Sequence, residues 1–389
     1  MNQLPVQVFD AARHTFRPAL LHLEGRRCLG VEPRSQGDGE LYLSPGFIDS
    51  HAHIYPGATD LGIAADRIGL STGVHLVVDA GSAGSTSFPC FRDYVVPTYQ
   101  VETRAFLNIS RVGLVTKQPY YDRRNLDQAA AEACLRNDRS GLLLGIKVLS
   151  SGLIVEDAGM EPIRAAAETG QRLGCPVMAH LVEGPPSNQE TMALLGPGDI
   201  ITHIFHGAPN LVANRKAGAH LDPRHCSLGN VMWNADGTPT PPLEAALARG
   251  VLLDVGHGAA SLDWEVARAT IGAGVRGFSI STDAHIRNIE TVVHSLPHVM
   301  GKFLALGMTL AEVVACVTSI PARQLGLTGW CDHLTHCATL FRVRPRLAQD
   351  PPYLDAYGAE IPAAQVIEPV AVIRRETLCS LDPSDSTHP

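Results

Sequence analysis

Eight short apolar runs, separated by helix-like segments, fill the middle of this 389-residue chain. The runs lie at residues 47–53, 75–80, 104–109, 143–149, 177–181, 200–205, 251–255 and 277–282. Strands that are apolar along their whole length are typical of a parallel sheet covered on both faces. Eight strand–helix units over about 250 residues are the usual size of a (β/α)8 TIM barrel, so we expect this α/β fold for residues 45–330. A doubly wound open sheet is the alternative, although no GxGxxG turn follows the first run.

Two of the helix-like segments have recognisable starts. Asn125 with Gln128 three residues later predicts a capped helix that begins beside Asn125. The pair Pro241-Pro242 predicts a second helix, which Gly250 ends. Both helices fall between apolar runs, as a strand–helix alternation requires.

The two ends of the chain have a different sequence pattern, in which short apolar runs alternate with turn residues. Runs of this kind lie at residues 6–9, 20–23, 338–341 and 369–373, and the pattern favours β-structure. We expect residues 1–44 and 331–380 to form one small β-sandwich domain around the inserted barrel. Residues 381–389 are polar and are expected to be a disordered tail.

The composition restricts the possible partners. The net charge is −8 without a run of Lys or Arg, which argues against a nucleic-acid partner. The sequence contains no run of about 18 apolar residues, so we expect no membrane span. The first residues do not resemble a signal peptide. The nine cysteines form no CxxC pair, so we expect reduced thiols and a cytoplasmic location.

Metal-binding residue types occur at the ends of the predicted strands. His51 and His53 are two residues apart, so both side chains project from one face of their strand. The other strand-end residues of this kind are Lys147, His180, His203 and Asp283. Each residue alone has an ordinary structural explanation. Because active sites of this barrel gather at the carboxyl ends of its strands, the set together indicates a metal site.

Six segments then resemble a known family. They are Pro45–His53, Val78–Gly84, Phe106–Ser110, Gly145–Lys147, Asp254–Gly258 and Ile280–Asp283. In this order they resemble the metal-dependent amidohydrolase superfamily, and within it the amidohydrolase/deacetylase branch, which is related to dihydroorotases and D-aminoacylases. The resemblance implies a distorted barrel, a β-sandwich from both termini, and two divalent metal ions, of which zinc is the expected one, although manganese, cobalt and iron bind comparable ligands.

The resemblance also implies a role for each ligand. His51, His53 and Asp283 would hold the more buried ion, His180 and His203 the more exposed ion, and Lys147 would bridge both. A lysine beside two cations favours its neutral amine, which can add carbon dioxide to become a carboxylate ligand. Two ions lower the pKa of a bridging water enough to supply hydroxide, and Asp283 is expected to be the catalytic residue that accepts its proton.

Substrate contacts are expected from residues that follow strands six and seven. His257 lies between two glycines, where the backbone can approach a ligand closely, and the alternative for it is a structural hydrogen bond. His206 and Asn210 are predicted to line the mouth of the site. Many relatives carry a basic residue after the bridging lysine, whereas Val148-Leu149-Ser150 follow it here, which leaves the recognition of an anionic substrate open.

The function expected from these residues is hydrolysis of an amide or ester bond in a small acylated carboxylic acid, such as an N-acyl amino acid or an O-acyl hydroxy acid. One alternative is the opening of a cyclic amide, as in dihydroorotases and hydantoinases. Another is a catalytically inactive scaffold of the same fold. We expect a small-molecule substrate and a homo-oligomer, with no nucleic-acid or membrane partner.

Overall fold

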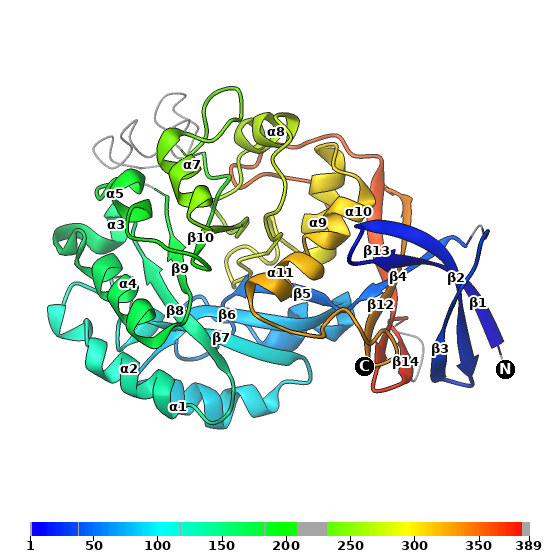
Figure 1. The fold of residues 1–389 in the computed structure, drawn as a ribbon, viewed down its shortest axis with the longest axis horizontal. Coiled ribbons are helices and arrows are strands. Elements are labelled where there is room, and N and C mark those ends of the chain that lie inside the picture. Colours follow the sequence, from blue (N-terminus) through cyan, green and yellow to red (C-terminus); the bar gives the residue numbers. More distant parts are fainter. Residues whose placement is uncertain (1, 38, 117, 183, 208–231, 383–389) are drawn as a thin grey trace.

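A computed structural model describes residues 2–37, 39–116, 118–182, 184–207 and 232–382. One of its two sheets has seven strands, each parallel to its neighbours, in the order β11-β10-β9-β8-β7-β6-β5 (Figure 1). The strands are β5 (Phe47–Ala52), β6 (Val74–Gly84), β7 (Glu102–Asn108), β8 (Leu143–Leu149), β9 (Val177–His180), β10 (Ile200–Thr202) and β11 (Leu252–Asp254). They coincide with the first seven of the eight predicted runs.

The eighth run joins the two edges of this sheet without forming a regular strand. Single parallel bridges pair Ser279 with Asp254 of β11 and Ala284 with Ala52 of β5. Backbone N–H groups of Val255 and Asp283 donate to Ser279 and His51 on the two sides. Asp283 has a φ of +46°, which interrupts strand geometry there. The predicted barrel is therefore confirmed, and its eighth position is filled by an irregular segment instead of a regular strand.

Helices lie outside the sheet, as Figure 1 shows. They are α1 (Phe88–Cys90), α2 (Gln128–Asn137), α3 (Gly152–Val155), α4 (Glu161–Leu173), α5 (Asn188–Met192), α7 (Pro241–Ala248), α8 (Trp264–Gly272), α9 (Leu296–Ala305), α10 (Leu310–Ala315) and α11 (Ser319–Gln324). The predicted start of α7 at Pro241 is confirmed, and Gly250 follows its end with a φ of +92°.

The predicted cap of α2 is wrong by two residues. Asn125 ends a separate 3₁₀ turn, Arg123–Asn125. Asp127 is the N-cap instead, because its carboxylate accepts the N–H of Ala130 at 2.9 Å.

A second sheet is built from both termini. Its strands are β1 (Asn2–Asp10), β2 (Thr15–Glu24), β3 (Arg27–Pro33), β4 (Leu41–Pro45), β12 (Cys337–Pro345), β13 (Gln365–Arg374) and β14 (Thr377–Ser380). The sheet closes on itself, because β4 pairs with both β1 and β12. One residue, Gly46, separates β4 from β5, so the small domain leads directly into the first barrel strand.

The small domain and the barrel share apolar packing. Phe9 and Phe341 of the terminal sheet belong to the same buried cluster as Phe47 of the barrel. The first and last strands of the chain, β1 and β14, both belong to the terminal sheet (Figure 1).

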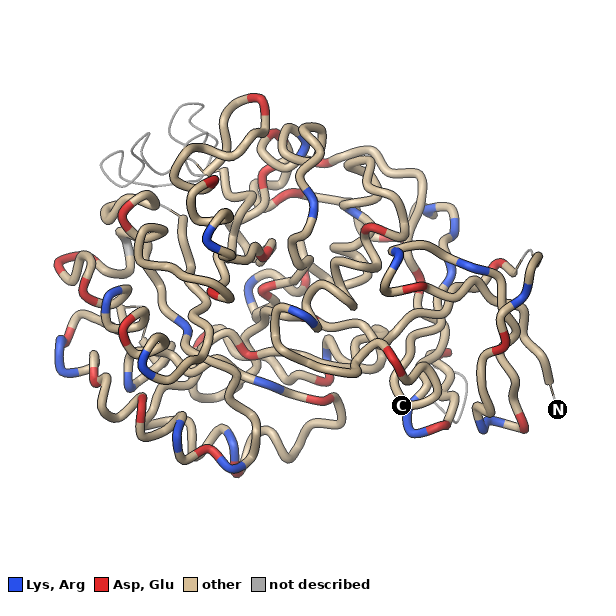
Figure 2. The backbone as a smooth tube through the Cα atoms, viewed as in Figure 1, with Lys and Arg blue, Asp and Glu red and all other residues tan. Residues whose placement is uncertain are grey.

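The surface of the described chain carries charges of both signs. Figure 2 shows basic and acidic segments interspersed along the outer helices and loops. The eight cysteines within the described residues are free thiols. Every helix in the described part of the chain is too short or too polar to cross a lipid bilayer.

Candidate metal centre

All six predicted ligands line one cavity of about 430 Å³ at the carboxyl ends of the barrel strands. Its volume is within the range of small-molecule sites, about 300–1,000 Å³. Five ligands come from four strands or the residue after them, and the sixth follows the irregular eighth segment. In chain order they are His51, His53, Lys147, His180, His203 and Asp283.

His51, His53 and Asp283 form the tightest group. Each offers a ligand atom, and these atoms all lie within 4.8 Å of one another. Asp283 Oδ1 is 3.2 Å from His53 Nε2 and 3.5 Å from His51 Nε2. Oδ1 is buried and accepts no hydrogen bond from any described residue. A divalent cation is a partner that one carboxylate oxygen and two ring nitrogens can share, so the residues fit a metal ion.

Lys147 lies at the base of the same cavity and is almost fully buried, with 2% of its surface exposed. Its amine is 3.4 Å from His51 Nε2. Burial lowers the pKa of Lys147 to about 8, against its usual 10.5, because a charged amine is poorly solvated there. Gly81 of β6 makes room for it, since a Cβ at this position would lie 2.5 Å from the Lys147 side chain.

His180 and His203 form the second histidine pair, with ring centroids 4.4 Å apart. Burial lowers the pKa of both residues well below its usual range, so both rings are neutral at pH 7. His203 Nδ1 donates to the carbonyl of Gly256 at 2.7 Å. Its Nε2 therefore carries the lone pair that a metal ion needs.

The other histidines are oriented by similar partners. His51 Nδ1 lies 3.0 Å from Thr202 Oγ1 and 3.3 Å from Asp254 Oδ2. His53 Nδ1 lies 3.0 Å from Ser82 Oγ, and the backbone N–H of Ser82 donates to Asp79 at 2.7 Å. These contacts occupy Nδ1 and leave Nε2 facing the cavity, which is the arrangement typical of metal-binding histidines.

Asp254 is a site residue that the sequence did not single out. Its fully buried carboxylate accepts hydrogen bonds from four hydroxyl groups as well as contacting His51. The donors are Ser50, Thr202, Ser279 and Ser281. Asp254 could have been identified from the sequence as the polar residue at the end of an apolar strand.

The predicted substrate contacts have different environments. His257 is fully buried and absent from the lining of the cavity; its Nε2 accepts from Lys302 Nζ at 2.7 Å, which matches the structural alternative. His206 is also buried outside the described cavity lining, and burial lowers its pKa to about 4. Asn210 lies outside the described residues. Substrate binding by these three residues stays a prediction.

The other residues that line the cavity, here called its rim, were not singled out by the sequence analysis. The apolar ones are Leu61, Leu114, Leu149 and Ile154, and the polar ones are Gln118, His285 and Arg287. They come from separate loops and strand ends, and no sequence spacing connects them.

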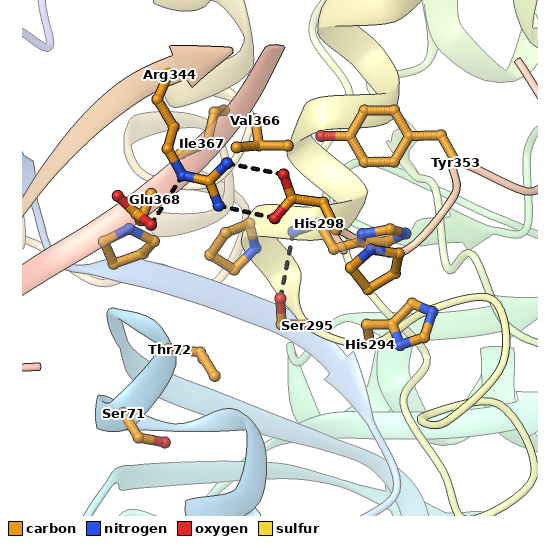
Figure 3. Close-up of a pocket in the computed structure, with 14 residues that line it drawn as sticks. Ser71, Thr72, His294, Ser295, His298, Arg344, Tyr353, Val366, Ile367 and Glu368 are labelled. Atoms are coloured by element: carbon orange, nitrogen blue, oxygen red, sulfur yellow. Dashed lines mark hydrogen bonds and ion pairs between the residues drawn. The ribbon is translucent and has the colours of Figure 1, made fainter. Parts of the chain in front are cut away.

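A smaller cavity, of about 270 Å³, lies between α9, β12 and β13 (Figure 3). Arg344 spans it, donating to Asp350 and Glu368. His294 and His298 also line it, with ring centroids 4.7 Å apart. Within the described chain no third ligand joins these two histidines in a cluster, so the cavity lined by the six predicted ligands is the candidate metal centre.

Comparisons with known proteins identify relatives of this chain. Deacetylase Atu3266 of Agrobacterium fabrum is 33% identical over 288 residues, which are 74% of this chain and 66% of that protein. A deacetylase of Brucella anthropi is 33% identical over 297 residues, 76% of this chain and 69% of that protein. No family model matches the chain.

Solved structures show the same fold. A dihydroorotase is 27% identical with a TM-score of 0.78, and the match covers 98% of each chain. An adenine deaminase has a TM-score of 0.80 at 24% identity, covering 98% of this chain and all of that one. The deacetylase relatives, together with the dihydroorotase, show that the chain belongs to the deacetylase branch of the metal-dependent amidohydrolase superfamily.

Proposed function

We propose that this protein is a binuclear metal-dependent hydrolase that removes the acyl group from a small acylated carboxylic acid, either an N-acyl amino acid or an O-acyl hydroxy acid. The observation that carries the proposal is the convergence of four histidines, Lys147 and Asp283 on one cavity. The deacetylase names of the curated relatives support the bond type.

The six side chains would divide between two ions. His51, His53 and Asp283 would hold one ion, His180 and His203 the other, and a carboxylated Lys147 would join them. Zinc is the ion we propose, because neutral imidazole and carboxylate oxygen are among its preferred ligands. When bound, the two ions supply an activated water and a Lewis acid for the substrate carbonyl.

The protein's own residues would move the protons. Burial alone would raise the pKa of Asp283. The contacts with His51 and His53 outweigh this effect, so the pKa of Asp283 lies well below its usual range. The carboxylate is therefore ionised at neutral pH. It would accept a proton from the attacking water at an Oδ atom and deliver that proton to the leaving amine or alkoxide.

A substrate screen tests the proposal. Zinc-loaded protein, prepared with bicarbonate, is assayed on acetylated and formylated amino acids, acetylated hydroxy acids, dihydroorotate and hydantoins. We expect turnover of acylated acids. Turnover of the cyclic amides alone would favour the cyclic amide hydrolase, and no turnover with intact metal would favour the inactive scaffold.

Asp283→Asn is the matched variant for this screen. The amide keeps an oxygen ligand but cannot accept the proton, so we expect most of the metal to be retained and kcat to fall roughly 1,000-fold. Metal content and kcat are measured on the same preparation. A rate near that of the wild type would contradict the proton-transfer role of Asp283.

A further inference from the structure

The rim of the metal cavity combines one exposed cation with an aliphatic wall. Among the described residues that line the cavity, the basic side chains are Lys147, buried at its base, and Arg287, of which 46% is exposed. Four aliphatic side chains, Leu61, Leu114, Leu149 and Ile154, line the same space. A ligand matching this lining has an anionic group beside an apolar one.

The backbone fixes Arg287 relative to Asp283. Asn288 is fully buried, and its amide donates to the carbonyl of Asp283 at 2.8 Å and accepts the N–H of His285 at 2.9 Å. The N–H of Arg287 donates to His285 Nδ1 at 3.2 Å. These hydrogen bonds restrain the backbone of residues 283–288 and so fix the position of Arg287 relative to Asp283, the predicted metal ligand.

The loop opposite contributes to the same arrangement. The N–H of Ile286 donates to the carbonyl of Leu61 at 2.9 Å, and the Arg287 guanidinium is paired with Asp60. Asp60 restrains one edge of the guanidinium group, while Leu61 adds to the aliphatic wall. The ion pair between Arg287 and Asp60 is exposed, and exposed ion pairs add little to the stability of the folded protein. A contribution to stability therefore does not explain an arginine at this position.

We propose that Arg287 binds the carboxylate of the substrate and that the aliphatic wall accepts its side chain. The planar guanidinium group suits a carboxylate, which it can bind through two parallel hydrogen bonds. The substrate class is then the acyl derivatives of α-amino or α-hydroxy acids with apolar side chains. This inference rests on the proposed hydrolase function.

Kinetics on a matched pair of substrates test it. N-acetylleucine carries the carboxylate, and N-acetylleucinamide lacks it. In Arg287→Met, we expect the KM for N-acetylleucine to rise on the order of 10- to 100-fold, while the KM for the amide stays unchanged. Arg287→Lys should recover part of the loss. Arg124→Met is the control, because Arg124 is also exposed and paired with an aspartate, Asp122, but does not line the cavity.

A binding measurement separates this inference from the hydrolase proposal. Calorimetric titration of zinc-loaded protein compares isocaproate with isocaproamide. We expect the carboxylate to bind on the order of tenfold more tightly or better, and Arg287→Met to abolish that preference even if no acylated acid is hydrolysed. A preference that survives in Arg287→Met would overturn the role of Arg287. Equal kcat/KM for N-acetylaspartate and N-acetylleucine would overturn the role of the aliphatic wall.

Discussion

At the scale of single residues, burial prepares the side chains of the cavity for binding a cation. His180 and His203 are neutral because their surroundings disfavour a charge. Each neutral ring has one nitrogen with a free lone pair, and the contacts made by Nδ1 of His51, His53 and His203 leave Nε2 as that nitrogen. The nitrogen that each of these histidines offers to a metal ion thus depends on the residues that contact its Nδ1.

Lys147 gives a pH prediction at this scale. Only the neutral amine adds carbon dioxide, and its pKa is about 8 in the folded protein. Below this pKa the neutral fraction falls about tenfold per pH unit. At fixed dissolved carbon dioxide, the metal-free protein should therefore be carboxylated faster at pH 9 than at pH 7, by roughly tenfold.

Carbon-13 NMR with labelled carbon dioxide measures this reaction through the carbamate signal. Lys147→Ala is the control, and it should give no such signal from the site. A rate that does not change with pH would contradict the predicted titration of Lys147.

At the scale of elements, β6 shapes the centre through one glycine. Gly81 has a φ of +85°, and an added Cβ would meet the side chain of Lys147. Gly81→Ala should therefore cost roughly 3 kcal/mol of unfolding free energy and displace the lysine. The expected accompanying result is a loss of bound metal.

Gly141→Ala is the matched control for that substitution. Gly141 has a similar φ of +68°, but nothing lies within 4 Å of an added Cβ. Its cost should be about 1 kcal/mol, with metal retained. Urea unfolding and metal analysis of both variants give the comparison, and equal losses would argue against the steric role of Gly81.

Elements also explain how much the sequence could predict. Apolar runs with His53, Lys147 or His180 at or near their ends predicted both the strands and the side chains that line the cavity, because a strand end in this barrel faces the site. The cap of α2 was missed because Asn125 and Asp127 are both good cap residues, and only the observed turn distinguishes them. The rim was not predictable, because Leu61 and Arg287 are brought together by loop contacts between distant segments.

At the scale of the whole molecule, the barrel and the terminal sheet depend on each other. Thr339 Oγ1 of β12 donates to the carbonyl of Gly73, the residue before β6, at 2.7 Å. Phe341 packs on Phe47 of β5, with ring centroids 5.6 Å apart. The first barrel strand is thus supported by residues almost 300 positions further along the chain.

This shared packing predicts that the two parts unfold together. In urea, tryptophan fluorescence and far-UV circular dichroism of the metal-free protein should follow one transition. Phe341→Ala should lower the unfolding free energy obtained from each signal by the same amount, about 3–5 kcal/mol. Two separate transitions, with only one of them moved by the substitution, would contradict a common core.

The central claim is that six side chains hold a pair of divalent ions. Its most direct test is the metal content of protein reconstituted with zinc and bicarbonate, measured by elemental analysis per chain. We predict two ions in the wild-type protein and a clear loss in Lys147→Ala, which removes the bridging ligand. Fewer than one ion per wild-type chain would contradict the account.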